Sequence, residues 1–344
     1  MKRRLTITVW SILVVHLTIG QLCAQHPPIA PQSPSPTLRS PLPKKPLPPW
    51  SSILPLAHVL FVSNQNSASF GLYSMAVDGT DLKQIPGWQS TDNWPSFSPD
   101  GRSIVFASRR TGSWHLYAMN ADGTHVHQLT AGPNQELEPV YSPAGGVLAF
   151  TCVGNGWQDI CLAGPDGTSM VKLTDGRGQY SSPAFSPNGQ AITFVGRPWV
   201  APSVNPCSCR FILTDIYLIR LSSRTMSLVP IRLTDGSAAR YAPSFTPDSQ
   251  HIVYAQAAYN DVPNLYVMNL DGSGQTALPL DPFPPNDEPI VRGNRLLFVN
   301  QANGGWDVYS ANLDGTEAQD LTSGQGRYGT EHLRYLDVFS YGYH

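Results

Sequence analysis

The sequence predicts an all-β fold built from a repeated unit of four short antiparallel strands, and three observations support this. Residues 94–101, WPSFSPDG, return in copies that begin at Pro139, Pro183 and Pro243, with an eroded fifth at Glu288-Pro289. An Asp-Gly-Thr or Asp-Gly-Ser signature keeps step with them, at residues 78–80, 122–124, 166–168, 271–273 and 314–316. Alternation over 4–8 residues dominates and helical periodicity is absent. Periods of this length indicate a repeat architecture.

The second unit shows how each repeat is organised. A strand containing Pro95 and Phe97 ends at the turn of residues 98–101, where proline presets φ and glycine supplies a positive φ. Residues 103–107 and 114–119 form the next two strands, and residues 122–124 make a tight hairpin turn to a short fourth strand. One such sheet cannot bury both of its faces. Radial packing of several sheets, as in a β-propeller, solves that problem.

The third strand of each unit allows the blades to be counted. It recurs at residues 72–75, 116–119, 159–162, 215–218, 265–268 and 307–310, which predicts a six-bladed β-propeller with four antiparallel strands per blade. The first unit begins at its second strand, residues 59–62. We expect residues 333–339 to supply the missing innermost strand, so that the C-terminal strand closes blade one. Each large apolar side chain buried there contributes roughly 1.5–3 kcal/mol.

These motifs resemble the repeat of the TolB-type β-propellers over roughly residues 57–344. Ser-Pro-Asp-Gly before a β-branched strand, Leu-Tyr-x-Met, Asp-Gly-Thr and Leu-Thr carry the resemblance. TolB is a periplasmic protein of the Tol–Pal envelope system, binds the lipoprotein Pal and has an α/β domain ahead of its propeller. The resemblance therefore implies an exported protein-binding propeller, and we expect the α/β domain to be missing here.

Two segments precede the propeller. Lys2, Arg3 and Arg4 followed by the mostly apolar run 5–22 predict a signal peptide over residues 1–24, with an uncleaved anchor as the alternative. Cys23 is a weaker lipidation candidate, because residues 20–22 do not resemble a lipobox. Residues 25–56 are proline-rich and predict a disordered, extended linker, read either as a tether or as a solvated spacer without a partner. The propeller would then occupy residues 57–344.

Charge limits the choice of partner. Charged residues form 13% of the chain, and the net charge of −2 becomes −5 if Lys2, Arg3 and Arg4 leave with the signal peptide. A mildly acidic chain without a basic run argues against nucleic acid or anionic lipid as the main partner. We expect a periplasmic or secreted protein, in contact with a membrane only through an uncleaved leader, and a monomer.

Four cysteines remain after the leader. Cys152 and Cys161 are predicted on the second and third strands of one blade, and they form either a cross-strand disulfide or two separate buried thiols. The bridge would close a short loop and add roughly 2–3 kcal/mol. Cys207 and Cys209 could form a strained bridge, bind a metal or do neither, but four metal ligands at zinc-site spacing are absent.

The first candidate site is the mouth of the central channel, where residues just before each first strand should gather. Aligning the repeats assigns to it Asp92, Trp94, Glu136, Glu138, Tyr180, Arg240, Tyr241, Asp287, Glu288, Glu331 and His332. Its carboxylates could hold a divalent cation or a cationic ligand, or form a solvated acidic funnel. The family resemblance makes this channel a place where an extended segment of a partner could enter.

The second candidate site is an insertion in blade four, residues 196–210, which lengthens that repeat to about 60 residues. Function tends to lie on variable loops over a rigid scaffold. Arg197, Trp199, Arg210 and Phe211 would suit a binding surface, because aromatic and arginine side chains are common hot spots. The alternative is an insertion that packs on its own blade.

Enzymatic motifs are few. The sequence has no nucleophile elbow leading into a helix and no phosphate-binding glycine loop. We therefore expect a non-enzymatic scaffold that binds another envelope or secreted protein, such as a Pal-like lipoprotein, and needs no cofactor. The alternative is a metal-dependent hydrolase or lyase with its site in the channel, for which Glu136, Glu138, Glu331 and His332 are the suspects.

Overall fold

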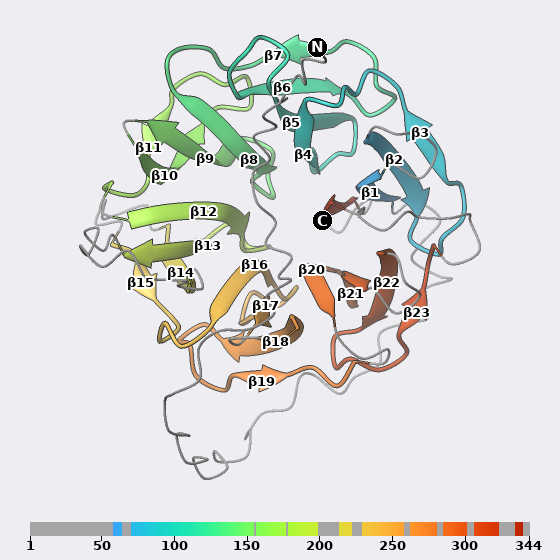
Figure 1. Cartoon of the computed structure of the whole chain (residues 1–344), viewed down its shortest axis with the longest axis vertical. Helices are drawn as coiled ribbons and strands as arrows, with labels where there is room; N and C mark the ends of the chain where they lie inside the picture. The colour runs from blue at the N-terminus through green and yellow to red at the C-terminus, as the bar shows by residue number, and fades with distance from the viewer. Residues whose placement is uncertain are drawn as a thin grey trace, which may run out of the picture. The chain divides into compact units, whose positions relative to one another are not determined.

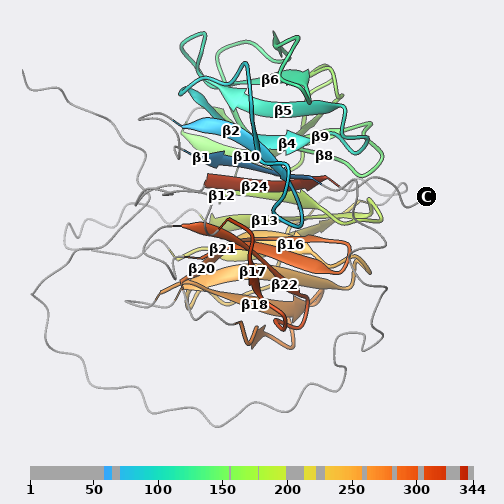
Figure 2. The same cartoon turned by 90° about the vertical axis from the view of Figure 1, so that its right-hand side faces the viewer.

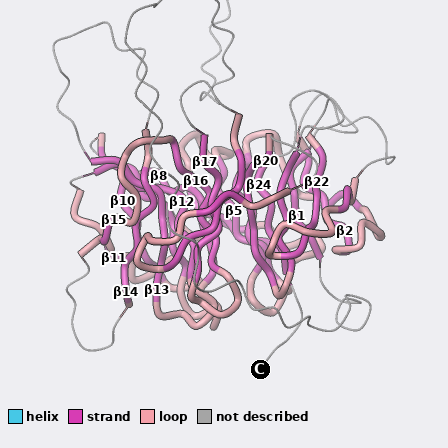
Figure 3. Tube along the Cα trace, turned by 90° about the horizontal axis from the view of Figure 1, so that it is seen from below, coloured by secondary structure: helices cyan, strands magenta, loops and turns pink. Residues whose placement is uncertain are grey.

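The computed structural model describes residues 58–63, 70–154, 156–176, 178–198, 213–221, 229–257, 262–280, 285–300, 306–322 and 334–339. In these residues the regular structure consists of strands joined by turns and loops, and no helix is present (Figure 3). The strands are arranged as a ring around a central axis (Figure 1). From the side, they run along that axis (Figure 2).

Going outward from the centre, each unit contributes four strands in turn. The strands nearest the axis are β24 (Arg334–Phe339), β4 (Asp92–Phe97), β8 (Gln135–Tyr141), β12 (Gly178–Phe185), β16 (Ala239–Phe245) and β20 (Asn286–Arg292). The second strands are β1 (His58–Ser63), β5 (Ser103–Ser108), β9 (Leu148–Gly154), β13 (Ala191–Pro198), β17 (His251–Ala257) and β21 (Arg295–Asn300).

The outer half of each unit repeats in the same way. The third strands are β2 (Gly71–Ala76), β6 (His115–Asn120), β10 (Trp157–Ala163), β14 (Asp215–Arg220), β18 (Asn264–Asn269) and β22 (Asp307–Asn312). The rim is made of β3 (Lys83–Ile85), β7 (His127–Gln128), β11 (Val171–Lys172), β15 (Ile231–Arg232), β19 (Thr276–Ala277) and β23 (Gln319–Asp320).

The all-β propeller prediction is confirmed, but the division into sheets differs from it. Four separate four-stranded blades are present rather than six, because the other eight strands form one sheet. That sheet contains two consecutive groups, β8–β11 and β12–β15. Within the described residues they are joined by one parallel pair, Gln158 with Gln179.

The parallel pair is one case of a contact that recurs between neighbouring units. The amide of Glu136 donates to the carbonyl of Trp114 at 3.0 Å, and the amide of Arg240 donates to the carbonyl of Thr214 at 3.2 Å. In each case the start of an innermost strand meets the start of the preceding unit's third strand. The sheet count therefore depends on how closely the two segments approach, which the sequence pattern does not specify.

The ring closes at the centre as predicted, through the C-terminal strand. β24 pairs antiparallel with β1, and the first sheet has the order β24-β1-β2-β3. β24 also contacts β4 and β20, the innermost strands on either side of it. The last described strand thus completes the first described unit.

The hydrophobic core lies between neighbouring units. Second strands are buried on both faces, which is why residues 104–107 read as an unbroken apolar run with each side chain 0% exposed. One cluster joins Val105 and Trp114 of the second unit to Phe150 and Cys161 of the third. Each of these large side chains contributes roughly 1.5–3 kcal/mol on burial.

A stacked ring pair links the second and third strands in most units. The rings belong to residues directly opposite in the register, with centroids 5.7–5.9 Å apart, in the pairs Phe61–Tyr73, Phe106–Tyr117, Phe194–Tyr217, Tyr254–Tyr266 and Phe298–Tyr309. Such pairs add to the stability obtained from area burial. In the third unit, Phe150 faces Cys161 instead.

The Asp-Gly-Thr turns have a second role that explains their fixed interval. Gly167 has a φ of +78°, and a Cβ there would lie 2.4 Å from the carbonyl oxygen of Leu129 in the preceding unit. At Gly79 a Cβ would lie 2.6 Å from the carbonyl oxygen of Leu321, which belongs to the last unit. Glycine is required by the turn and also by the close approach of the neighbouring blade. The ring is therefore closed at its rim as well as at its centre.

Candidate functional site

Each innermost strand described in full is interrupted by a bulge at the same place. The register shifts there in β4, β8, β12, β16 and β20. The bulge residue precedes a proline and has a φ of about +50°, although it is not glycine; these residues are Trp94, Glu138, Ser182, Ala242 and Glu288. Non-glycine residues in this region are strained, and such strain is common at functional sites. The bulges form a belt around the inner wall of the ring.

The residue two positions before the bulge is buried in each of these strands. Four predicted mouth residues occupy this position: Asp92, Glu136, Tyr180 and Arg240. Their placement at an open mouth is corrected, because they lie inside the wall with partners of their own. Side chains alternate along a strand, so a residue one position away can be partly exposed while its neighbour is buried.

Asp92 and Glu136 each pair with a basic side chain. The Asp92 carboxylate accepts hydrogen bonds from the Arg110 guanidinium at 2.6 Å and from the amide of Gln89 at 2.7 Å. The Glu136 carboxylate lies 2.8 Å from His115 Nδ1 and accepts from the Thr130 hydroxyl at 3.0 Å. Both carboxylates have partners within the fold that hold them in the wall, although in the described residues Asp92 Oδ1 accepts no hydrogen bond.

Tyr180 contributes to the core. Its ring meets Phe194 at 5.4 Å and Tyr217 at 5.7 Å, both edge to face. Burial raises the pKa of the Tyr180 phenol. The ring therefore fills the space beside the stacked pair of the fourth unit.

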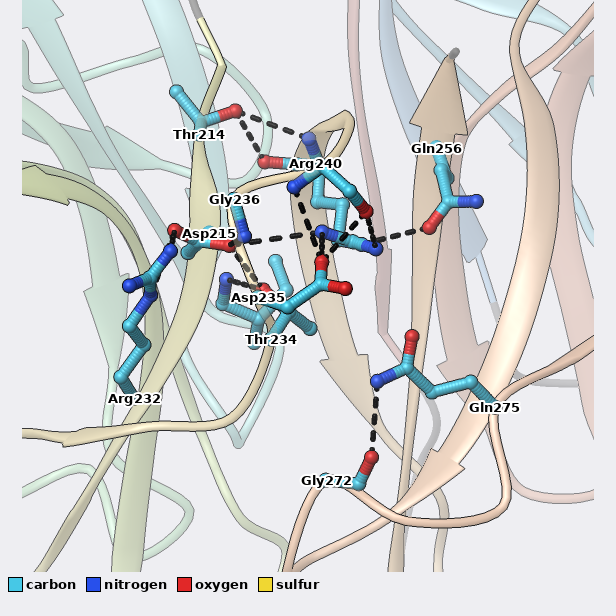
Figure 4. Close-up of polar contacts among 12 residues, drawn as sticks. Thr214, Asp215, Arg232, Thr234, Asp235, Gly236, Arg240, Gln256, Gly272 and Gln275 are labelled. Atoms are coloured by element: carbon cyan, nitrogen blue, oxygen red, sulfur yellow. Dashed lines mark hydrogen bonds and ion pairs between the residues drawn. The ribbon is translucent and has the colours of Figure 1, made fainter. Parts of the chain in front are cut away.

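Arg240 is the centre of a polar network that joins the fourth and fifth units (Figure 4). Its Nε donates to Gln256 at 2.7 Å, and its Nη1 lies 3.0 Å from Asp235 and 3.6 Å from Asp215. Its backbone nitrogen and carbonyl oxygen both bond to Thr214. The side chain is 5% exposed, so this buried charge depends on its partners.

The two carboxylates of this network differ in exposure. Asp215 is buried and also accepts from Arg232, the Thr234 hydroxyl and the Gly236 amide. Asp235 is largely exposed, and hydrogen bonds from Ser237, reinforced by Arg240, lower its pKa to about 2. Asp235 therefore remains charged at neutral pH, and both side chains hold Arg240 in place.

The bulge residues and those directly before them form the partly exposed part of the inner wall, named here the bulge belt. It consists of Asn93, Trp94, Leu137, Glu138, Ser181, Ser182, Tyr241, Ala242, Asp287 and Glu288. Five predicted mouth residues, Trp94, Glu138, Tyr241, Asp287 and Glu288, belong to it. Ser182 was not among the predicted site residues, although the alignment of Ser-Pro with Trp94-Pro95 could have found it.

Hydrogen bonds link the bulge belt from one unit to the next. The Glu138 carboxylate accepts from the backbone amide of Ser182 at 2.6 Å and from the Thr151 hydroxyl at 2.7 Å. The Tyr241 hydroxyl donates to Asp287 at 3.3 Å. Among the described residues, neither carboxylate has a basic side chain as a hydrogen-bond partner. Trp94 packs instead on Trp114, with ring centroids 5.1 Å apart.

Asp287 has a perturbed acidity. It keeps part of its surface accessible, yet desolvation by the surrounding protein raises its pKa to about 6, against the opposing effect of bonds from the Glu288 amide and Tyr241. Burial and the Asp287 charge raise the pKa of Tyr241 in turn. A carboxylate that the fold destabilises in this way is a candidate for a functional role.

Replacing Asp287 with asparagine is expected to stabilise the protein at pH 7 and above. Because the folded pKa exceeds the unfolded one, the stabilisation from protonated Asp287 is complete below about pH 4 and is lost as pH rises through about 6. Asp287→Asn avoids that loss, which is at most about 3 kcal/mol. Thermal melts from pH 4 to 8 should show variant and wild type converging at low pH. A constant difference across this range would contradict the assignment.

Other predicted residues have different placements. Arg197 donates through Nε to Gln179 at 2.7 Å and so binds within its own blade. Trp199, Arg210 and Phe211 of the insertion lie outside the described residues, as do Cys207 and Cys209. Glu331 and His332, the remaining mouth residues, also lie outside them.

The predicted disulfide between Cys152 and Cys161 is present. The two Cα atoms are 5.9 Å apart, and both residues are buried. In the register Cys152 faces Asp159 and Cys161 faces Phe150, so the bridge runs diagonally between the strands. It occupies the place where the other units carry the tyrosine of the stacked ring pair.

Within the described residues, no group of three or more His, Cys, Asp or Glu side chains is arranged to hold a metal ion. Glu136 and Glu138, two of the four suspected ligands, bind to different partners on neighbouring strands. The described part of the chain also contains no helix that is long and apolar enough to cross a membrane.

Comparisons with known proteins agree with this repeat geometry. The family described as TolB beta propeller domain matches residues 48–205. TolB from Acinetobacter baumannii has a similar structure, with a TM-score of 0.64 and 17% identity over 82% of this chain and 66% of that one. This chain therefore carries a TolB-like propeller repeat over residues 48–205. It spans just under two thirds of the length of the A. baumannii protein.

Two further solved structures resemble the TolB-like propeller. Putative TolB from Agrobacterium tumefaciens matches with a TM-score of 0.56 and 19% identity, over 77% of this chain and 88% of that one. A chain of a nidogen/laminin complex matches with a TM-score of 0.59 and 10% identity, over 82% of this chain and 98% of that one. At these identities the likeness establishes the fold alone. A comparison with curated proteins found no match.

Proposed function

We propose that this chain is an exported, non-enzymatic scaffold that binds another envelope or secreted protein at the bulge belt. In this proposal the eight-stranded sheet acts as two blades joined by one parallel pair, so that six units surround the channel. The family match supports a periplasmic or secreted location, and the disulfide supports an oxidising compartment.

The observation that carries this proposal is the combination of free strand edges and partly exposed side chains around one axis. β4, β8, β16, β20 and β24 each end the strand order of their sheet, so beyond the contacts near the starts of β8, β16 and β20 their inner backbone edges pair with no further strand of the described residues. Unpaired edges can accept an extended segment through main-chain hydrogen bonds. The bulges interrupt these edges and place side chains of the bulge belt beside them.

The chemistry of the bulge belt favours a basic partner segment. Glu138 and Asp287 are held by neutral donors, and Trp94 adds an aromatic surface. A lysine or arginine from a partner would stabilise the Asp287 carboxylate that burial destabilises. The resemblance to TolB makes a Pal-like lipoprotein the first candidate, with a basic extended segment as the recognised part.

The test compares two neutralising substitutions that keep side-chain shape. A partner is first recovered by pull-down from envelope extract, and its affinity for the purified wild type and variants is then measured. Glu138→Gln and Asp287→Asn are each expected to weaken binding about tenfold, which corresponds to about 1.4 kcal/mol. Asp287→Asn should do so while raising stability at pH 7, so unfolding cannot explain the loss.

The control is Asp166→Asn, which neutralises an exposed carboxylate in an Asp-Gly-Thr turn at the rim. Its binding is expected to equal that of the wild type. If Glu138→Gln and Asp287→Asn bound the partner as tightly as the wild type and Asp166→Asn do, the bulge belt would not be the binding surface. A weakened control would indicate a general charge effect rather than recognition in the channel.

A further inference from the structure

In one five-residue segment, three buried polar atoms have no hydrogen-bond partner among the described residues. They are Trp88 Nε1, Thr91 Oγ1 and Asp92 Oδ1. A buried donor or acceptor left unpaired is costly, and folded proteins pair the great majority of such groups with protein or ordered water. Three within five residues indicate a common partner rather than three separate losses.

The segment is held firmly where it passes from β3 to β4. The amide of Asp92 donates to the carbonyl of Gln89 at 3.0 Å, and the amide of Arg109 donates to the carbonyl of Thr91 at 3.1 Å. Asp92 Oδ2 is already occupied by Arg110 and by the Gln89 amide. The Trp88 ring packs on Phe106, with centroids 5.3 Å apart. These contacts hold the backbone at Gln89 and Thr91, one oxygen of Asp92 and the ring of Trp88 in place.

Comparison with the fourth unit explains why polar groups gather here. There, Tyr180 occupies the position of Asp92 and places its ring on the stacked pair Phe194–Tyr217. In the second unit the corresponding pair is Phe106–Tyr117, and the Arg110 guanidinium lies 5.3 and 5.0 Å from these rings. A guanidinium tied to a carboxylate replaces an aromatic ring at this place. Because the second unit has Asp92 where the fourth has Tyr180, the Oδ1 atom of Asp92 lies in the interior.

We propose that Trp88, Thr91 and Asp92 together bind one internal water molecule beside the Arg110–Phe106 contact. The indole nitrogen can only donate, the carboxylate oxygen can only accept, and the threonine hydroxyl can do either. One water molecule satisfies all three, and two to four polar partners are typical of buried water. Arg110 already balances the Asp92 charge, so a neutral water molecule fits this set better than a cation. The water fixes the segment that leads into the bulge belt.

The sign of one substitution tests this proposal. If Thr91 Oγ1 bonds to the water, Thr91→Val removes a satisfied bond and lowers Tm by about 2–4 °C. If the hydroxyl has no partner, the same change removes an unpaired group and Tm stays equal or rises. Thr193→Val is the matched control, because its buried hydroxyl donates to the carbonyl of Tyr217 at 2.9 Å. Its loss in Tm calibrates the expected effect.

A double-mutant cycle and a crystal structure complete the test. Trp88→Phe also changes packing, but the cycle with Thr91→Val cancels that contribution. Residues that share one water should couple, so the double variant should lose less than the sum of the single losses. Diffraction data that resolve solvent should show one water within about 3.2 Å of all three atoms. Additive losses, or no water at this place, would overturn the proposal.

Discussion

A chain truncated after residue 333, which lacks β24, is expected to lose its cooperative thermal transition. β24 supplies the innermost strand of the first unit and contacts the innermost strands on both sides of it. Without it, β1 has a free edge, and Val59, Phe61 and Val62, now 0% exposed, lie next to solvent. Two or three such side chains at roughly 1.5–3 kcal/mol each are comparable with a whole domain stability of about 5–15 kcal/mol.

Near-UV circular dichroism and size-exclusion chromatography would measure this effect. The truncated chain should lose its near-UV signal and aggregate, because an open ring exposes apolar surface and an unpaired edge. Adding a synthetic peptide of residues 330–344 in trans is the matched control, and it should restore part of the signal. A truncated chain that melts like the wild type would show that closure by β24 is dispensable.

Replacing Arg240 with methionine is expected to lower the free energy of unfolding by about 3–5 kcal/mol. The change keeps an apolar stem but leaves the buried Asp215 with one basic partner fewer and Gln256 Oε1 without its donor. Arg240 joins two units, so the loss weakens the interface between them. Denaturant unfolding measured at pH 7 would give the difference.

Lys172→Met provides the comparison for Arg240. Lys172 also pairs with a buried carboxylate, Asp159, at 2.8 Å, but its own side chain is 64% exposed. Exposed partners contribute about 0–1 kcal/mol, and Asp159 keeps its bonds from Thr174 and Gly176. Equal losses for the two variants would mean that burial of the cation does not determine the cost.

Repetition made much of the fold predictable from the sequence. The residues of the Ser-Pro-Asp-Gly and Asp-Gly-Thr turns determine those turns locally, and each strand between them shows its own alternation. The strand order and the closure by residues 334–339 could therefore be predicted from the sequence. The joining of two units through Gln158 and Gln179 did not follow. It depends on a small difference in distance between segments that have no motif.

The candidate site was less predictable, because alignment of repeats gives position along a strand but not the side on which a residue lies. Asp92, Glu136 and Arg240 align with the channel mouth, yet they are buried in the wall. The bulge shifts the alternation by one residue, and Trp94 and Glu138 therefore fall on the exposed side. A proline preceded by varied residues in five units was the available sign of that bulge.

The bridge between Cys152 and Cys161 stands where other blades rely on stacked rings. Ring stacking does not depend on thiol chemistry, but in this blade Cys161, and not a tyrosine, lies opposite Phe150. A chain made under reducing conditions would thus lack the bridge in this blade, whereas the two neighbouring blades would keep their stacked rings. The stability of the closed ring would consequently depend on the redox conditions under which the chain folded.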